Sequence, residues 1–413
     1  MRTFLFILSA ALPVLAIALS RGGGACNFEV DCSLNGMCVS GICVCHSGWG
    51  GAVCSQLALL PAPTTAAYGG GLGGNVSSWG GGVALDPASG KYVMYVSEMS
   101  RHCGLGTWGQ NSRCVAALSD TPIGPYQKYR TLQSAWCHGA GLARDPLSGT
   151  FVFQHMSRGA TPATKCLQCF NGTTPHNASQ GPCDADADAL PYTDSAFTAP
   201  WSNGPFSPAP KFINGGNCET FFATDGTASV ACPTGSDTTD SFLSVRTAPS
   251  IAAAIAGTWT QLPQTLSVAG SNVSVAYIGF HWEDQNIWRD PRGYFHTIMH
   301  AYRGQNTTLP EPGCVNIGGG VWFPQDCTSL GGHAFSIDGS HWWISREPSY
   351  TALIQFENDT AVQMRARERP HLIFGSNGEA IAFLSGVGDP GCGGNTGCAD
   401  MDHTFTLIQP LAQ

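Results

Sequence analysis

Apolar and polar positions alternate over short stretches from about residue 70 to the end of the chain, a pattern that predicts β-strands. Each stretch reads as a strand, a turn built on Asp with Gly, and a second strand rich in Tyr, Phe, Val or Trp, which together predict a β-hairpin. We expect hairpins at residues 83–97, 141–156, 221–232, 287–301 and 333–345.

The spacing of these hairpins predicts a β-propeller. They lie roughly 50 to 80 residues apart, whereas the strands of a β-sandwich would lie closer together and end sooner. The only helical signal is a turn or two at Ser250–Gly257, so we expect an all-β fold built of four-stranded blades. A further strand-turn-strand at residues 367–387 is expected to close the ring.

The first twenty residues predict a secretory signal. Arg2 precedes an apolar run that ends in small residues, and we expect cleavage near Ser20 and a secreted, extracellular or cell-surface protein. Retention of the run as a membrane anchor is the alternative. Eighteen cysteines agree with an oxidising compartment, as do Asn-x-Ser/Thr sequons at Asn75, Asn171, Asn177, Asn272, Asn306 and Asn358.

The low charge of the chain narrows the choice of partner. Charged residues make up 11% of the sequence, against about 25% in average proteins, and the formal net charge is −9. Lys and Arg form no clusters, which argues against nucleic acid and against anionic membranes. We therefore expect a neutral, polyhydroxylated ligand such as a carbohydrate or glycoconjugate.

Residues 26–54 contain six cysteines and end in the pattern Cys-x-Cys-x-x-Gly-Trp-x-Gly-x-x-Cys. This stretch resembles an EGF-like module, and so short a segment needs covalent cross-links because it cannot bury a core. Spacing alone leaves fifteen pairings open. The resemblance implies the pairs Cys26–Cys38, Cys32–Cys43 and Cys45–Cys54. Arg21–Ala25 lacks the acidic residues of calcium-binding modules, so we expect a structural spacer.

The predicted organisation is a signal peptide (1–20), an EGF-like module (21–57), a Pro/Ala/Thr-rich linker (58–70) and the propeller (71–413). Within the propeller we expect short loops closed by disulfides. The expected pairs are Cys103 with Cys114, Cys166 with Cys183 or a neighbour, Cys314 with Cys327, and Cys392 with Cys398.

The hairpins resemble the five-bladed propellers of arabinanases and xylosidases, glycoside hydrolase family 43 and its relatives. That resemblance implies three carboxylates in a central channel, one of them an acid and one a base. It places the acid at Glu283, with Asp284 beside it. The other two positions fall at Asn217 and near Gly80, which carry no carboxylate. The base would then be Asp284, Glu219 or a histidine-oriented water.

Strand alternation predicts that Glu283 and Asp284 point to opposite faces, so that only one of them faces the channel. The alternative is that neither residue is catalytic: one carboxylate would accept hydrogen bonds from backbone N–H groups at the start of the blade, and the other would be exposed to solvent. His138, His296, His300 and His333 are expected to point imidazoles toward the channel, although buried histidines are more often satisfied by backbone groups. Together they could bind a cation such as calcium; no other cofactor is expected. The spacing of His296 and His300 lacks the Glu of a zinc-protease motif.

Tryptophans lie beside most hairpins, and most of them are expected in the core. One or two at the mouth of the channel, with Trp79 as the candidate, could stack on a sugar. Two functions fit these features: a secreted glycosidase with Glu283 as acid, or a glycan-binding or adhesive protein that has lost its catalytic carboxylates. Two carboxylates in one pocket would favour the enzyme, and an apolar plug would indicate a structural protein.

Overall fold

The computed structural model describes residues 21–388 and 403–413, except 72–73, 158–162, 171, 173, 175–176, 185, 187, 216, 234–242, 270–279, 304–313, 317–321, 325–329 and 346. The signal predicted at residues 1–20 and the pairs proposed for Cys327, Cys392 and Cys398 lie outside these residues. In the described part of the chain, no helix is long and apolar enough to span a membrane.

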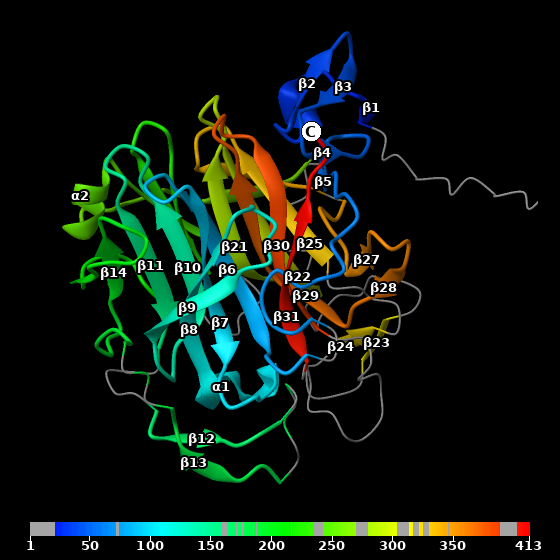
Figure 1. The fold of residues 1–413 in the computed structure, drawn as a ribbon. Coiled ribbons are helices and arrows are strands. Elements are labelled where there is room, and N and C mark those ends of the chain that lie inside the picture. Colours follow the sequence, from blue (N-terminus) through cyan, green and yellow to red (C-terminus); the bar gives the residue numbers. More distant parts are fainter. Residues whose placement is uncertain are drawn as a thin grey trace, which may run out of the picture.

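Five antiparallel sheets form the body of the molecule (Figure 1). The first contains β6 (Ser78–Asp86), β7 (Lys91–Met99), β8 (Ser112–Ser119) and β9 (Gln127–Gln133). The second contains β10 (His138–Arg144), β11 (Phe151–Met156), β14 (Ala196–Ala199) and β15 (Ser207–Ala209). The third contains β16 (Glu219–Phe222), β17 (Ala228–Cys232), β18 (Ser244–Ala248) and β19 (Thr260–Gln261).

The fourth sheet contains β21 (Phe280–Arg289), β22 (Phe295–Arg303), β25 (Leu330–Ser336) and β26 (His341–Ile344), with β20 (Thr265–Val268) added in parallel at its edge. The fifth contains β29 (Ala366–Phe374), β30 (Ala380–Gly388) and β31 (Thr404–Pro410). Short two-stranded sheets extend from these blades: β12 (Lys165–Leu167) with β13 (Gln180–Pro182), β23 (Cys314–Asn316) with β24 (Trp322–Pro324), and β27 (Leu353–Gln355) with β28 (Ala361–Gln363).

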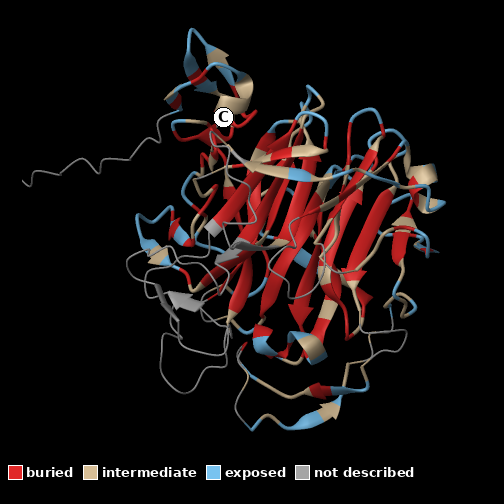
Figure 2. Cartoon of the chain, turned by 180° about the vertical axis from the view of Figure 1, so that it is seen from behind, coloured by how far each residue is buried: buried red, intermediate tan, exposed pale blue. Residues whose placement is uncertain are grey.

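The sheets are arranged as a ring. The first strands β6, β10, β16, β21 and β29 adjoin one another in that order, and β29 adjoins β6 again. Each seam between neighbouring sheets holds its own apolar cluster, for example Tyr95, Leu142 and Phe153 between the first and second. The other four clusters fill the remaining seams. This is a β-propeller, as predicted, and its strands are buried along most of their length (Figure 2).

Helices are short and lie in connections. They are η1 (Glu29–Cys32), η2 (Leu105–Thr107), α1 (Trp108–Asn111) and α2 (Ile251–Ile255). The last begins where a helical turn was predicted, because the Ser250 hydroxyl caps it by accepting a hydrogen bond from the Ala253 N–H at 3.2 Å.

The EGF-like module packs at one end of the ring, beside the C-terminus (Figure 1). Its strands are β1 (Gly22–Ala25), β2 (Gly36–Val39), β3 (Ile42–Cys45), β4 (Trp49–Gly50) and β5 (Gln56–Leu57). The three predicted disulfides of this module are all present. Trp49 is buried against Trp288 and His333 of the fourth blade, with ring centroids 6.1 and 4.9 Å apart.

The segment predicted as a linker runs along the propeller. Isolated bridges join Leu59 to Leu411 and Tyr68 to Thr406, so residues 58–70 lie beside β31 in the last blade. The side chains of Ala62 and Tyr68 are buried there. This segment therefore connects the EGF-like module rigidly to the ring.

Two of the predicted disulfide partners are wrong. Cys103 pairs with Cys169 and Cys114 pairs with Cys137, whereas the sequence analysis joined Cys103 to Cys114. The physical reason is topology, since the start of β8 lies beside the segment that leads into β10 and not beside the loop that follows β7. Cys166 does pair with Cys183, and Cys218 pairs with Cys232.

Candidate functional site

Five residues with left-handed backbone conformations surround the centre of the ring, one from each blade. They are Gly80 (φ 63°), Gly139 (61°), Asn217 (61°), Asp284 (57°) and Arg369 (54°). Pairing in β6, β10, β21 and β29 shifts register at this level, which marks a β-bulge in each strand. A left-handed conformation is uncommon for residues other than glycine, and bulges are frequent next to active sites. We call these five residues the bulge ring.

A pocket opens within the bulge ring. It is lined by Gly81, Gly139, Ala140, Asn217, Cys218, Glu219, Asp284, Arg369 and Pro370, and its volume is about 20 Å³. That volume is enough for about one water molecule. Two carboxylates, Glu219 and Asp284, therefore face one small polar pocket.

Arg369 fills the space that two glycines leave open. A Cβ atom at Gly80 would lie 2.6 Å from the Arg369 Cβ, and one at Gly139 would lie 3.0 Å from Arg369 Nη1. The family resemblance implied a carboxylate near Gly80. In this chain the aliphatic stem of Arg369, from the fifth blade, packs against Gly80, and its guanidinium reaches Gly139 at the pocket wall.

Asp284 is buried and bound by Arg369. Arg369 Nε lies 3.2 Å from Asp284 Oδ1, and the Arg369 backbone N–H donates to Oδ2 at 3.2 Å. Burial raises the pKa of Asp284 to about 6, against the opposing effect of the Arg369 charge. The carboxyl group can therefore gain and lose a proton near neutral pH.

Glu219 belongs to a hydrogen-bonded group with Asn286 and His371. The Asn286 amide donates to Glu219 Oε2 at 2.5 Å, and His371 Nδ1 lies 3.4 Å from the same oxygen. The Val83 N–H donates to His371 Nε2 at 3.4 Å, and the Asn286 amide nitrogen lies 3.2 Å from His371 Nδ1. Glu219 thus accepts a hydrogen bond from Asn286 and contacts His371, and these two neighbours hold it toward the pocket.

A second group of acids adjoins the pocket. One ligand atom each of Glu283, Asp284 and His300 lies within 4.8 Å of the others, and His300 Nε2 is 3.8 Å from Glu368 Oε1. Burial, followed by the charges of Asp284 and Glu283, raises the pKa of Glu368 to about 8. Glu283, Asp284 and His300 could hold a divalent cation, but three donors are fewer than the six to eight oxygens that calcium takes.

The bulge at Asp284 corrects one sequence expectation. Regular alternation would have sent Glu283 and Asp284 to opposite faces, but the left-handed residue interrupts the alternation, so both carboxylates reach the same group. Asp284 lines the pocket, whereas Glu283 lies beside it.

The predicted histidines divide between the two ends of the ring. His138 and His300 lie near the pocket; His138 Nδ1 is 2.7 Å from the Ser112 hydroxyl. His296 and His333 do not reach the pocket, which corrects the expectation for both. Their rings stack 5.5 Å apart at the other end, where His333 contacts Trp49 of the EGF-like module. His300 pairs with Glu283 beside the bulge, whereas His296 pairs with Trp288 nearer the hairpin turn. His296 and its neighbour His333 therefore lie farther along the strands from the pocket.

The expectation that Trp79 could stack on a sugar at the mouth of the channel is also wrong. It is 3% exposed and packs with Met99, Leu105 and Ala366 in an apolar cluster. Asn217, by contrast, lines the pocket.

Sequence reasoning missed Arg369, Glu368 and His371, and it considered Glu219 only as one alternative base. A signal for the bulge ring was present in the spacing to the hairpin turns. Three ring residues lie six positions before the Asp of the next turn: Gly80 before Asp86, Gly139 before Asp145, and Asp284 before Asp290.

Comparisons with known proteins give one matching family model and a set of similar solved structures. Residues 28–57 match the family model described as a Teneurin-like EGF domain. A comparison with curated protein sequences finds no match. Among solved structures, a thermostable family-43 glycoside hydrolase is similar over 83% of this chain and 92% of its own, with 10% identity and a TM-score of 0.46.

Two further similar structures are fungal. An α-L-arabinofuranosidase from Podospora anserina, solved in complex with cellotriose, is 11% identical over 87% of this chain and 99% of its own, with a TM-score of 0.47. The catalytic domain of a family-62 α-L-arabinofuranosidase from Coprinopsis cinerea is 10% identical over 86% of this chain and 98% of its own, also with a TM-score of 0.47.

Proposed function

We propose that the protein is an extracellular glycoside hydrolase with Asp284 as general acid and Glu219 as general base. The observation that supports this is the shared pocket, which two carboxylates from the inner strands of neighbouring blades line together. Hydrolysis of a glycosidic bond needs one carboxylic acid and one carboxylate on either side of the bond. Asp284 takes the role that the sequence suggested for Glu283, because Asp284 faces the pocket.

The proposed reaction uses the water-sized pocket. Glu219 removes a proton from a water molecule, whose oxygen attacks the anomeric carbon. The bond from that carbon to the leaving oxygen breaks, and Asp284 gives its proton to this oxygen. Asn286 and His371 hold Glu219 in place, and burial keeps Asp284 protonated up to a pH of about 6. The sugar lies over the mouth of the pocket.

The test is release of reducing sugar from plant- and algal-type polysaccharides and of the aglycone from aryl glycosides. We expect Glu219→Gln and Asp284→Asn each to lower turnover by roughly a hundredfold or more, the usual contribution of a general acid or base. Glu357→Gln, which changes an exposed carboxylate in a surface turn, is the matched control. Full activity in either pocket variant would reject the assignment, and Glu283→Gln tests the alternative acid.

A second function, glycan binding without hydrolysis, is favoured by Arg369. Its side chain covers Gly80 and Gly139, and its Nε and backbone N–H each contact the Asp284 carboxylate, so the acid is bound within the protein. In that case the same glycans would bind without release of sugar by wild-type protein. Binding with no turnover on the whole panel would establish this function and exclude the first.

A further inference from the structure

An exposed aromatic side chain lies at the pocket end of the ring, in the connection between β7 and β8. Trp108 begins α1 and is 40% exposed. Its ring contacts Trp136 and His138, with centroids 5.8 and 5.3 Å apart. Both of these supporting rings are buried. Trp108 is thus partly exposed and partly packed on two buried rings.

Trp108 is connected to the pocket through His138. His138 begins β10, and the next residue, Gly139, is a member of the bulge ring and lines the pocket. Arg369 Nη1 lies 3.0 Å from the position of a Cβ on Gly139. The buried ring of His138 therefore connects the side chain of Trp108 to the wall of the pocket, where Arg369 and Asp284 lie.

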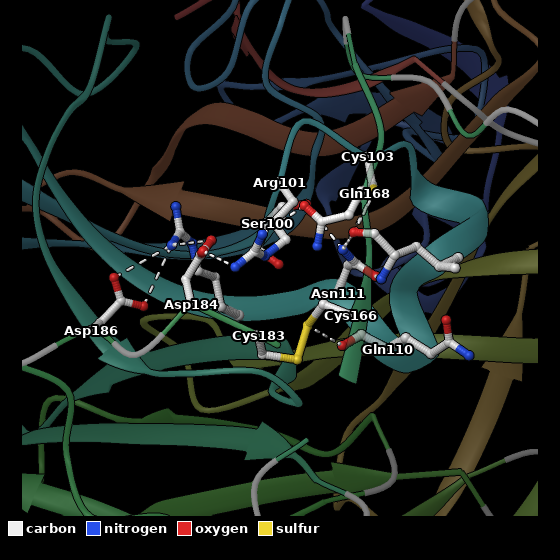
Figure 3. The surroundings of a disulfide bond; sticks show 12 residues. Ser100, Arg101, Cys103, Gln110, Asn111, Cys166, Gln168, Cys183, Asp184 and Asp186 are labelled. Carbon is white, nitrogen blue, oxygen red and sulfur yellow. Dashed lines mark hydrogen bonds and ion pairs between the residues drawn. A yellow bond between two sulfur atoms is a disulfide. The ribbon is translucent and has the colours of Figure 1, made fainter. Parts of the chain in front are cut away.

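The helix that carries Trp108 is held in place at Asn111, which lies beside the Cys166–Cys183 disulfide (Figure 3). Asn111, at the end of the same helix, is fully buried; its side chain donates to the Leu167 carbonyl at 2.9 Å and accepts from the Leu167 N–H at 3.0 Å. The segment that carries Leu167 is closed by Cys166–Cys183 and tied to the β7–β8 connection by Cys103–Cys169. A platform fixed before binding loses little conformational entropy when a ligand arrives.

The charges around this platform are already paired within the protein. Arg101 contacts Asp184 at 2.8 Å, and Arg113 contacts Asp186 at 3.4 Å and Glu98 at 2.5 Å. An indole face with neutralised surroundings suits the apolar C–H face of an uncharged sugar ring better than it suits an anion.

We propose that Trp108 forms an outer subsite that stacks on one residue of a neutral oligosaccharide whose neighbouring residue lies over the pocket. This inference rests on the proposed function, since it takes the central pocket as the glycan site. It makes the ligand an oligosaccharide rather than a single sugar, because Trp108 and Asp284 lie on different blades with His138 and Arg369 between them.

The experiment is calorimetric titration with arabino-, xylo- and cello-oligosaccharides of increasing length, using the Glu219→Gln protein so that ligands persist. Trp108→Ala, added to this background, should weaken binding of the longer ligands by about tenfold, the factor that corresponds to 1.4 kcal/mol. Trp108→Phe should recover part of the loss because it restores an aromatic face. Trp201→Ala, which removes a tryptophan that is 54% exposed in the β14–β15 turn, is the matched control.

The outcomes separate this inference from the proposed function. If the parent protein binds oligosaccharides and Trp108→Ala binds them equally well, with an unchanged thermal unfolding curve, the outer subsite is rejected while the central site stands. If Trp108→Ala and Trp201→Ala weaken binding equally, the subsite is also rejected. If the parent binds no glycan in the panel, both proposals fail.

Discussion

Asp284 and Arg369 occupy equivalent positions in the inner strands of neighbouring blades, and their side chains meet with Arg369 Nε 3.2 Å from Asp284 Oδ1. Each has a left-handed backbone that a strand bulge imposes. The pair places a guanidinium beside one of the two carboxylates of the pocket, the other being Glu219. This contact affects whether Asp284 is protonated and can donate a proton to a substrate.

Removing the positive charge should shift the pH dependence of activity. Arg369 lowers the pKa of Asp284, so Arg369→Met should raise that pKa above its value of about 6. A general acid acts only while protonated, and activity falls as pH rises through its pKa. The alkaline limb of kcat/KM against pH should therefore move to higher pH in the variant. Arg246→Met, in an outer strand, is the control; an unmoved alkaline limb in Arg369→Met would exclude Asp284 as the acid.

Glu368 should make the fold less stable as pH rises. Its folded pKa of about 8 is above the ordinary value of 4.5, so the folded state holds a proton that the unfolded chain releases first. Its stabilising contribution is complete below about pH 4.5 and is lost as pH rises to about 8. The free energy of unfolding of wild type minus that of Glu368→Gln should fall across this window. A difference independent of pH would contradict the buried, proton-binding state of Glu368.

Trp49 should stabilise the whole molecule and not only the EGF-like module. Because it is buried against Trp288 and His333, Trp49→Ala should lower the free energy of unfolding by about 3–5 kcal/mol. Trp201→Ala should change it by less than about 0.5 kcal/mol. Urea unfolding followed by fluorescence and by circular dichroism should give one coincident transition in wild type. A separate early transition for the module would contradict rigid packing.

The two disulfides beneath Trp108 should differ in their effect on stability. Cys103–Cys169 spans 66 residues of sequence and Cys166–Cys183 spans 17, so the loop-entropy model assigns them about 4 and about 3 kcal/mol. Removing the longer loop as a Cys103→Ala, Cys169→Ala pair should therefore destabilise more than the matching pair of changes at 166 and 183. Equilibrium urea unfolding of the two double variants measures the order, and the reverse order would contradict the model.

Local patterns were enough to predict the repeating hairpins and the EGF-like module. Turns that contain Asp and Gly between aromatic strands are typical of β-hairpins. The spacing of six cysteines resembles that of EGF-like modules, and this resemblance implied their pairing. The disulfides of the propeller could not be predicted in this way. The choice of Cys169 and Cys137 as partners depends on which strand ends meet in the ring, and sequence distance does not contain that information.

The candidate site could also be predicted only in part, because some of its contacts depend on how the blades meet in the ring. The family resemblance pointed to Glu283 and Asp284, but the bulge that brings both carboxylates to one place breaks the alternation from which their directions were inferred. Arg369 gave no local signal of its role. It becomes part of the pocket because the last blade closes against the first, and Gly80 and Gly139 leave room for its side chain.

The bulge ring separates backbone geometry from side-chain identity. Five positions surround one axis, four of them at bulges in strand pairing, and in this chain they carry two glycines, an amide, a carboxylate and a guanidinium. A left-handed conformation costs a residue other than glycine about 1–2 kcal/mol, which a ring of this size can absorb at several positions. The backbone of the ring therefore tolerates different side chains at these positions. One substitution on one blade can change the charge of the channel without moving the other four blades.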